Sequence, residues 1–207
     1  IFRLINKLLP IGSGRILVDG QDIAQTKNDV GYMPQKDLLF PWRTIEKNLW
    51  LPMELKKLSK KEMARKSAAI LEEIGLSDYK DKYPKDLSGG MRQRISFART
   101  LLTDAKLMLL DEPFSALDSL TKMSMQEWLL SEWERHHKTI LFITHDVEEA
   151  IFLSDTIFVV KEKPITALET IKVPLPYPRN RQQLKDPCIL DLKESLIAQL
   201  KAQVMLS

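Results

Sequence analysis

The feature that most limits the possible folds is an apolar run that ends in two carboxylates. Residues 107–110 read Leu-Met-Leu-Leu, and Asp111 and Glu112 follow directly. A run without polar alternation predicts a strand that is buried on both faces, as in a parallel sheet covered by helices. Ligands of open α/β sheets lie at the carboxyl ends of such strands. The sequence therefore predicts an α/β fold with Asp111 and Glu112 at its ligand-binding edge.

Strands and helices alternate along much of the chain, which supports parallel pairing. An all-helical stretch over residues 44–103 interrupts the alternation and indicates an inserted subdomain. We expect an α/β core from residues 1–35 and 104–165, a helical subdomain at 36–103 and a proline-rich tail at 166–207. The elements expected are helices at 1–9, 60–74, 88–102, 118–136, 146–153 and 189–203, and strands at 15–18, 29–33, 106–110, 139–143 and 156–160.

Composition excludes several classes of protein. The 207 residues are 44% apolar and 29% charged, and the longest apolar runs are about four residues, far short of the roughly 20 that a spanning helix needs. A net charge of +3 without a concentrated basic stripe argues against nucleic acid as a partner. Cys188 is the single cysteine, so no internal disulfide can form.

Two further places carry residues suited to phosphate chemistry. Ser88 precedes two glycines, Gly89 and Gly90, at the start of a helix, where exposed backbone N–H groups and the helix dipole favour an anion. His145 follows the strand expected at 139–143 and is placed to hydrogen-bond a terminal phosphate. Each feature also has an ordinary structural interpretation, as a capped helix start or as a histidine at a strand end.

The order and spacing of these residues together are far more specific. They resemble the ATP-binding-cassette (ABC) ATPase family, in which a parallel-sheet core of the P-loop NTPase type carries an inserted α-helical subdomain. In that resemblance residues 87–91 are the signature loop, with Met91 in place of the commoner glutamine, and residues 115–118 are the D-loop. The resemblance implies Glu112 and His145 as catalytic residues, Asp111 and Gln35 as magnesium ligands, and nucleotide contacts from Gln35, Ser88, Gly89, Gly90 and Asp118.

The resemblance also implies cofactors, partners and a location. ATP is used with Mg²⁺, and two copies of the subunit face each other head to tail. The partners implied are this second ATPase subunit, transmembrane permease subunits and, indirectly, a substrate-binding protein. The chain would lie at the cytoplasmic face of the cell membrane.

Two segments narrow the resemblance to importers. Residues 37–44 (Asp-Leu-Leu-Phe-Pro-Trp-Arg-Thr) and 173–181 resemble importers of the nitrate, sulfonate and taurine group, which also contains importers of pyrimidine-type precursors. Residues 163–165 (Lys-Pro-Ile) depart from that group, where a turn with glycine is usual. Trp42 either docks a permease helix in a groove or packs inside the helical subdomain.

A phosphate-binding loop of the form G-x-x-x-x-G-K-[ST] is not found in the sequence. No glycine is followed by lysine, and the chain begins at Ile1 with a pattern that follows this loop in the family. We expect a fragment of an ATPase that lacks the first strands and the loop, so that the 207 residues alone are inactive. The alternatives are a degenerate paralogue without catalysis and a soluble ABC ATPase of repair or translation.

Overall fold

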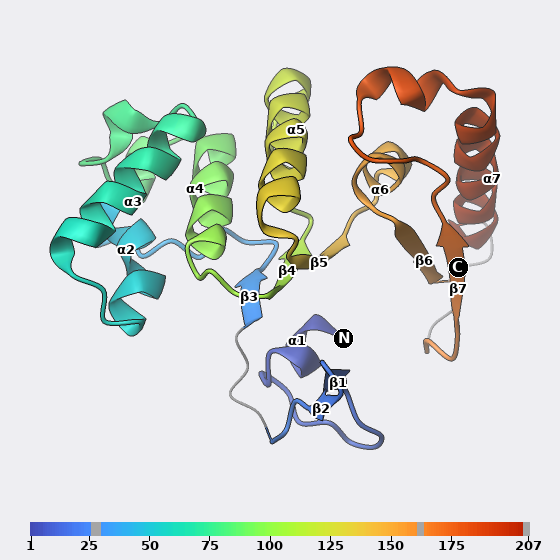
Figure 1. Cartoon of the computed structure of the whole chain (residues 1–207), viewed down its shortest axis with the longest axis horizontal. Helices are drawn as coiled ribbons and strands as arrows, with labels where there is room; N and C mark the ends of the chain where they lie inside the picture. The colour runs from blue at the N-terminus through green and yellow to red at the C-terminus, as the bar shows by residue number, and fades with distance from the viewer. Residues whose placement is uncertain (26–29, 161–163, 205–207) are drawn as a thin grey trace. The chain divides into compact units, whose positions relative to one another are not determined.

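The computed structural model describes residues 1–25, 30–160 and 164–204, which form two compact units (Figure 1). The first unit contains Ile1–Met125 and Arg135–Ile143, and the second contains Gln126–Glu134 and Thr144–Ser207. Helix α5 (Ser119–His136) contributes residues to both. Each unit has an apolar core of its own.

The first unit is built on a parallel sheet in the order β3 (Val30–Met33), β4 (Leu107–Asp111) and β5 (Thr139–Ile143). Tyr32 lies opposite Leu109, which lies opposite Leu141. The buried run at the centre of the sequence is therefore the central strand, and the predicted α/β fold with a parallel sheet is confirmed. Asp29, which the sequence placed in the first of these strands, is outside the described residues.

Helices cover both faces of this sheet. On one face Phe2 and Ile5 of α1 (Phe2–Ile5) pack against Leu109. On the other face lies α4 (Gly89–Leu101), where a Cβ atom at Gly31 would come within 3.4 Å of Thr100 Cγ2 on the helix and within 2.7 Å of Oγ1 of Thr103 directly after it. A side chain at Gly31 would force the helix away, so glycine allows this packing.

The N-terminal elements are shorter than the sequence predicts. Helix α1 ends at Ile5 rather than at residue 9, and Asn6 Nδ2 donates to the carbonyl oxygen of Phe2 at its end, 3.0 Å away. Lys7 then adopts a left-handed backbone with φ 57°, which stops the helix. A short antiparallel hairpin of β1 (Leu17–Val18) and β2 (Gln21–Asp22) follows.

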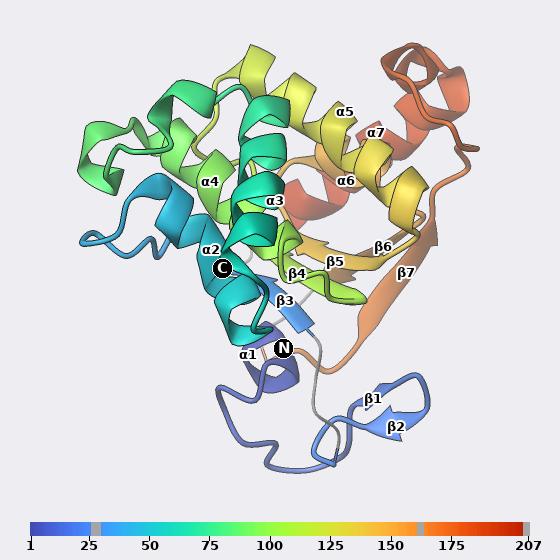
Figure 2. The ribbon, with the colours of Figure 1, turned by 60° about the vertical axis from the view of Figure 1, so that its left-hand side comes forward.

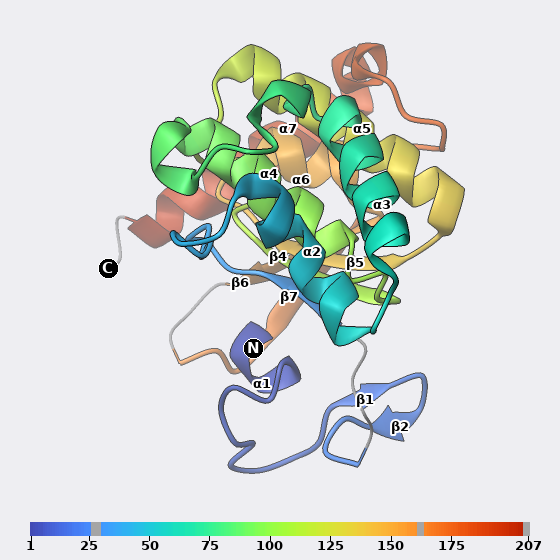
Figure 3. The ribbon, with the colours of Figure 1, turned by 90° about the vertical axis from the view of Figure 1, so that its left-hand side faces the viewer.

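Three helices, α2 (Ile45–Leu55), α3 (Lys60–Glu73) and α4, form a helical group beside the sheet (Figures 2 and 3). Ser59, which directly precedes the helix predicted at 60–74, caps it, because Ser59 Oγ accepts from the backbone N–H of Glu62 at 3.3 Å. Gly75, directly after the predicted end of this helix at residue 74, has a left-handed backbone with φ 66°. Two short 3₁₀ turns, η1 (Ser77–Tyr79) and η2 (Pro84–Asp86), lead into α4.

The second unit contains α6 (Val147–Leu153), an antiparallel pair of β6 (Thr156–Val160) and β7 (Leu168–Lys172), the 3₁₀ helix η3 (Arg181–Lys185) and α7 (Pro187–Val204). The expectation that β6 is a further parallel strand is wrong. Strand β6 pairs antiparallel with β7, which lies in the segment expected to be a tail. Lys163, part of the departure from relatives, lies outside the described residues. No helix in the described ranges is long and apolar enough to span a bilayer.

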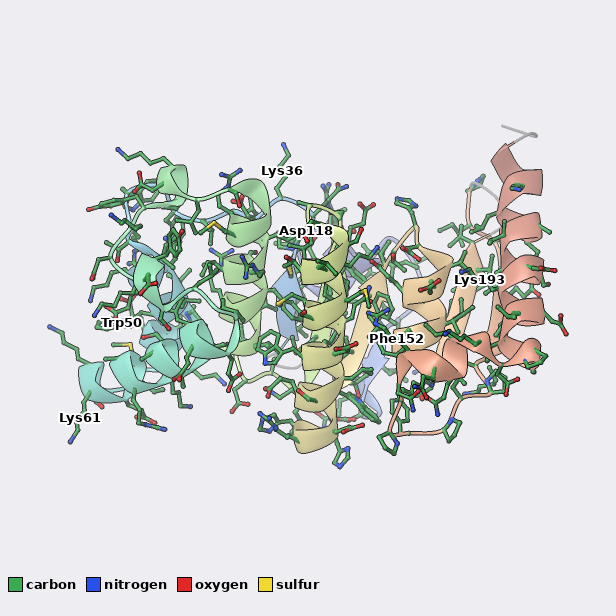
Figure 4. The ribbon with its side chains drawn as sticks, turned by 90° about the horizontal axis from the view of Figure 1, so that it is seen from above. Lys36, Trp50, Lys61, Asp118, Phe152 and Lys193 are labelled. Carbon is green, nitrogen blue, oxygen red and sulfur yellow. The ribbon has the colours of Figure 1, made fainter. Side chains whose placement is uncertain are left out.

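Buried Arg179 ties the second unit together. Its Nη1 atom donates to the carbonyl oxygens of Ile151, Phe152 and Ser154 at 2.9–3.1 Å, which satisfies the carboxyl end of α6. Figure 4 labels Phe152 and, on α7, Lys193, whose Nζ atom lies 2.7 Å from Oε2 of Glu148. The proline-rich tail is thus part of a packed unit rather than an extended appendage.

Candidate functional site

The central contact of the site joins Gln35 and Glu112. Gln35 follows β3 by two residues and Glu112 follows β4 by one, so the two parallel strands deliver both side chains to the same sheet edge. Gln35 Nε2 donates to Glu112 Oε2 at 3.0 Å. Two residues separated by 77 positions in sequence, which the family resemblance assigns to one site, are therefore in contact.

Glu112 has an unusual backbone. Its N–H still donates to the carbonyl oxygen of Ile143 on β5 at 3.0 Å, but its φ angle is 49°. A left-handed backbone is uncommon for a residue with a side chain and costs about 1–3 kcal/mol. Such strain concentrates at functional sites, where neighbouring structure enforces it.

Asp111 ends β4 beside this contact and supplies the second carboxylate. Burial and the nearby charge of Asp111 raise the pKa of Tyr32 above its usual value. A carboxylate from Asp111 and an amide oxygen from Gln35 are the hard oxygen donors that Mg²⁺ prefers, and Mg²⁺ is usually held by one or two protein groups together with substrate phosphates. The donor set therefore fits. Among the described residues no cluster of three or more His, Cys, Asp or Glu forms a full metal cage.

Ser88 and Gly89 form an accessible helix start. Ser88 Oγ accepts from the backbone N–H of Met91 at 3.3 Å, which makes Ser88 the N-cap of α4. Ser88 and Gly89 are exposed, and the nearest atom to a Cβ built at Gly89 is Nη2 of Arg92, 3.9 Å away. The helix start is thus open to an approaching anion.

Gly90 has a packing role that the sequence did not reveal. A Cβ atom at Gly90 would lie 3.1 Å from the carbonyl oxygen of Ala116 and 3.3 Å from Cδ2 of Leu117. The second glycine therefore allows α4 to approach the loop after β4. The sequence argument that both glycines serve an anion is incomplete, and a nucleotide contact at Gly90 stays a prediction.

This difference predicts unequal effects of alanine at the two glycines. Gly89→Ala should leave the free energy of unfolding unchanged or raise it, because the site is open and alanine favours helix. Gly90→Ala should be less stable than Gly89→Ala by about 1 kcal/mol or more, because the added methyl group crowds a backbone oxygen. Urea unfolding of both variants measures the difference. Equal stabilities would contradict the close packing at Gly90.

Asp118 and His145 are placed differently from each other. Asp118, labelled in Figure 4 at the start of α5, accepts from the backbone N–H of Thr121 at 3.0 Å. This carboxylate therefore caps the helix, and the hydrogen bonds from Thr121 hold the pKa of Asp118 below its usual value.

His145 is exposed and belongs to the second unit, where Asp146 caps α6 through the backbone N–H of Glu148 at 2.8 Å. Nucleotide contacts by Asp118 and His145 stay predictions.

The segment after Gln35 is fixed to α4 by arginines that the sequence analysis missed. Arg92 Nε donates to Asp37 Oδ2 at 2.9 Å, and Arg99 donates to the carbonyl oxygens of Asp37 and Leu38 at 2.8 and 2.9 Å. Lys36, labelled in Figure 4, extends away from the ribbon at this segment. Arg92 and Arg99 are seven residues apart, which places them on one face of the helix. In the sequence, this spacing was the only local indication that α4 binds the segment after Gln35.

Trp42 is 72% exposed, so the alternative that it packs inside the helical subdomain is wrong. Its ring lies 5.2 Å from that of Phe40, centroid to centroid. It borders a groove of about 550 Å³ whose other lining residues include Trp50, Met63 and Tyr83. An exposed tryptophan beside a groove is typical of a protein-docking surface.

A helix-covered parallel sheet with an amide and two carboxylates at the carboxyl edge of neighbouring strands is the arrangement found in nucleotide hydrolases of the P-loop class. The family model described as "ABC transporter" matches residues 1–115. The chain belongs to the ABC transporter family.

Several curated proteins are similar in sequence. The formylaminopyrimidine import ATP-binding protein ThiZ of Halalkalibacterium halodurans is 45% identical over 174 residues, which cover 84% of this chain and 68% of that protein. The uncharacterized ABC transporter ATP-binding protein MJ0412 of Methanocaldococcus jannaschii is 37% identical over 207 residues, covering 100% of this chain and 76% of that protein. The aliphatic sulfonates import ATP-binding protein SsuB of Bacillus cereus is 40% identical over 168 residues, which cover 81% of this chain and 66% of that protein.

Solved structures agree on the fold. A dimeric, post-hydrolysis structure of the ATP-binding cassette MJ0796 bound to ADP and Pi has a TM-score of 0.75 and 24% identity, covering 84% of this chain and 79% of that one. A second dimeric structure of the same cassette has a TM-score of 0.69 and 26% identity, covering 75% and 72%. The α/β fold with its helical group is therefore that of an ABC cassette.

Proposed function

We propose that this chain is the ATP-hydrolysing part of an ABC importer, coupling ATP hydrolysis to uptake of a small solute. The observation that carries the proposal is the hydrogen bond of 3.0 Å between Gln35 and Glu112 at the carboxyl edge of the sheet. The carboxylate in this contact belongs to Glu112, whose backbone is strained. Relatives named as import proteins favour import over a role in repair or translation.

Glu112 acts as the general base in this proposal. Its carboxylate is oriented by Gln35 and by the backbone turn after β4, and so can accept a proton from the attacking water. Asp111 and Gln35 would hold Mg²⁺, which supplies neutralisation of the phosphate charge when bound with ATP. His145 would donate a hydrogen bond to the terminal phosphate.

A second copy of the chain would complete each site. The open helix start at Ser88 and Gly89 faces solvent, and no phosphate-binding loop of the same chain packs on it among the described residues. In the head-to-tail arrangement these residues, with Gly90 and Asp118, meet the ATP held by the partner subunit. The similar cassette MJ0796 is described as dimeric, which supports this arrangement.

The names of the relatives support a proposal for the class of solute and for the location. ThiZ is named for formylaminopyrimidine import, SsuB for aliphatic sulfonates, and TauB of Rhizobium johnstonii, 40% identical over 164 residues, for taurine. We assign this chain a solute of the same small, polar type. Working with permease subunits and, through them, a substrate-binding protein, it would lie at the cytoplasmic face of the membrane.

Comparing two proteins tests the proposal. Residues 1–207 have no Gly-Lys pair to cradle phosphates and should bind Mg-ATP very weakly. The loop-restored chain, which carries a relative's first strands and phosphate-binding loop fused ahead of Ile1, should bind and hydrolyse it. Calorimetry and phosphate release measure both. Micromolar binding by residues 1–207 would contradict the need for the loop, and a loop-restored chain that binds ATP without turnover would identify a degenerate paralogue.

If a permease docks at the groove, replacing Trp42 should weaken assembly with the permease without lowering the stability of this chain. Trp42→Ala should weaken permease capture at least tenfold, because exposed aromatic anchors often carry about 2 kcal/mol of binding. The melting temperature should fall by less than about 2 °C, since the side chain is 72% exposed. The matched control is Leu55→Ala, an 80% exposed apolar residue that does not line the groove. Unchanged capture by the Trp42 variant would reject this docking surface.

A further inference from the structure

One buried side chain of α4 is bonded to a single loop. Gln93 is 4% exposed and makes three hydrogen bonds to the loop that follows β4. Its Nε2 atom donates to the carbonyl oxygen of Glu112 at 3.0 Å and to Ser115 Oγ at 3.2 Å. Its Oε1 atom accepts from the backbone N–H of Ala116 at 2.8 Å. Both ends of the amide are therefore satisfied by residues 112–116.

These bonds hold the strained part of the backbone. The carbonyl oxygen of Glu112 also accepts from Ser115 Oγ at 3.1 Å, so the peptide after the left-handed residue is anchored from two sides. The direction of the Glu112 side chain depends on this backbone, and its carboxylate meets Gln35. Losing the amide of Gln93 would leave the turn free to relax to an ordinary conformation.

A second contact brings the same two segments together. Gly90, one helical turn before Gln93, lets α4 approach within van der Waals distance of Ala116 and Leu117. Phe97, one turn after it, packs edge-on against Phe114 with ring centroids 6.0 Å apart. Gln93 is thus the polar member of a helix stripe formed with Gly90 and Phe97, and it supplies three directional bonds to the loop.

We propose that Gln93 is a positioning residue that fixes the Glu112 carboxylate and the loop at residues 115–118 to the helix that begins with Ser88 and Gly89. This rests on the proposed function of Glu112. Gln93 thereby connects two parts of one chain rigidly. One is the helix start that would meet one ATP, and the other is the Glu112 carboxylate that would act on a second ATP. Gln93 touches neither nucleotide in this account, and acts through the loop.

The clamp itself is tested in residues 1–207 without nucleotide. Ala116 is exposed, and Gln93 accepts its backbone N–H, so Gln93→Met should speed hydrogen exchange at that amide at least tenfold. Thr100→Val is the matched control, because Thr100 is also buried on α4 but its hydroxyl bonds only within the helix, to the carbonyl oxygen of Ser96. Unchanged exchange at Ala116 in the methionine variant would overturn the clamp.

The positioning role is tested in the loop-restored chain. Gln93→Met should lower kcat at least tenfold and leave the affinity for ATP within threefold, whereas Thr100→Val should keep kcat within twofold. Gln93→Asn keeps the amide but is one methylene too short, so it should resemble the methionine variant; it replaces that variant if methionine prevents folding. Turnover within twofold of the parent, or equal losses in the Thr100 control, would overturn the role.

The outcomes separate this inference from the proposed function. If Glu112→Gln keeps full turnover, the proposed function fails, and the exchange rate at Ala116 still reports the clamp. If Glu112→Gln abolishes turnover while Gln93→Met does not lower it, the function stands and the positioning role of Gln93 is wrong.

Discussion

Glu112→Gln should lower ATP turnover of the loop-restored chain by about 100- to 1,000-fold and leave ATP binding unchanged. Glutamine has the shape of glutamate and retains an oxygen that can accept the hydrogen bond from Gln35, but it cannot take a proton from water. A phosphate-release assay measures turnover, and calorimetry measures binding.

Glu62→Gln is the control for this change. Glu62 lies half-buried on the first turn of α3, an element that does not belong to the sheet, and its substitution should keep turnover within twofold. If Glu112→Gln retains turnover within tenfold of the parent, Glu112 is not the general base. A parallel loss of ATP binding would instead show that the substitution disturbs the site.

Asn48→Leu should lower the free energy of unfolding by about 3 kcal/mol. Asn48 is fully buried, its Oδ1 atom accepts from the backbone N–H of Phe40 at 2.7 Å, and its Nδ2 atom donates to the carbonyl oxygens of Phe40, Arg43 and Thr44 at 3.0–3.1 Å. Leucine fills similar volume but removes the partner of the Phe40 N–H and of the Arg43 carbonyl oxygen, whereas the carbonyl oxygens of Phe40 and Thr44 keep a backbone hydrogen bond. Each buried group that loses its partner costs about 1–3 kcal/mol.

Urea unfolding measures the loss at Asn48. Asn6→Leu is the matched control, because Asn6 makes one side-chain hydrogen bond, to the carbonyl oxygen of Phe2, at a partly exposed position; its cost should stay below about 1 kcal/mol. Equal costs at the two positions would show that the loop over residues 40–44 does not depend on Asn48. This loop carries Trp42. A large loss of unfolding free energy in the Asn48 variant would therefore also explain how the exposed tryptophan is held at the groove.

The sequence predicted those elements whose signals are local. Residues 107–110 predicted a strand buried on both faces, and β4 is the central strand of the sheet. Ser59 and Ser88 predicted helix starts, because a hydroxyl N-cap acts within one turn. Gln35 was assigned to the site only through the resemblance to the ABC family, and the parallel pairing of β3 and β4 places it with Glu112 at one edge.

Specific contacts between segments far apart in the chain could not be predicted from the sequence. Gln93 bonds to residues 19 to 23 positions away, and nothing near it distinguishes a buried amide from a solvated one. The antiparallel pairing of β6 with β7 was missed because the short strand Leu168–Lys172 lies in a proline-rich region. The packing reason for Gly90 likewise depends on a loop that follows the central strand.

The central claim is that two copies of this chain enclose ATP between them, with hydrolysis depending on Glu112. Light scattering on the loop-restored Glu112→Gln protein, with and without Mg-ATP, tests it most directly. The account predicts that the mass doubles with ATP and that adding Gly89→Asp, which sets a carboxylate at the open helix start, prevents doubling while ATP stays bound. A protein that binds ATP and keeps the mass of one copy would contradict the claim.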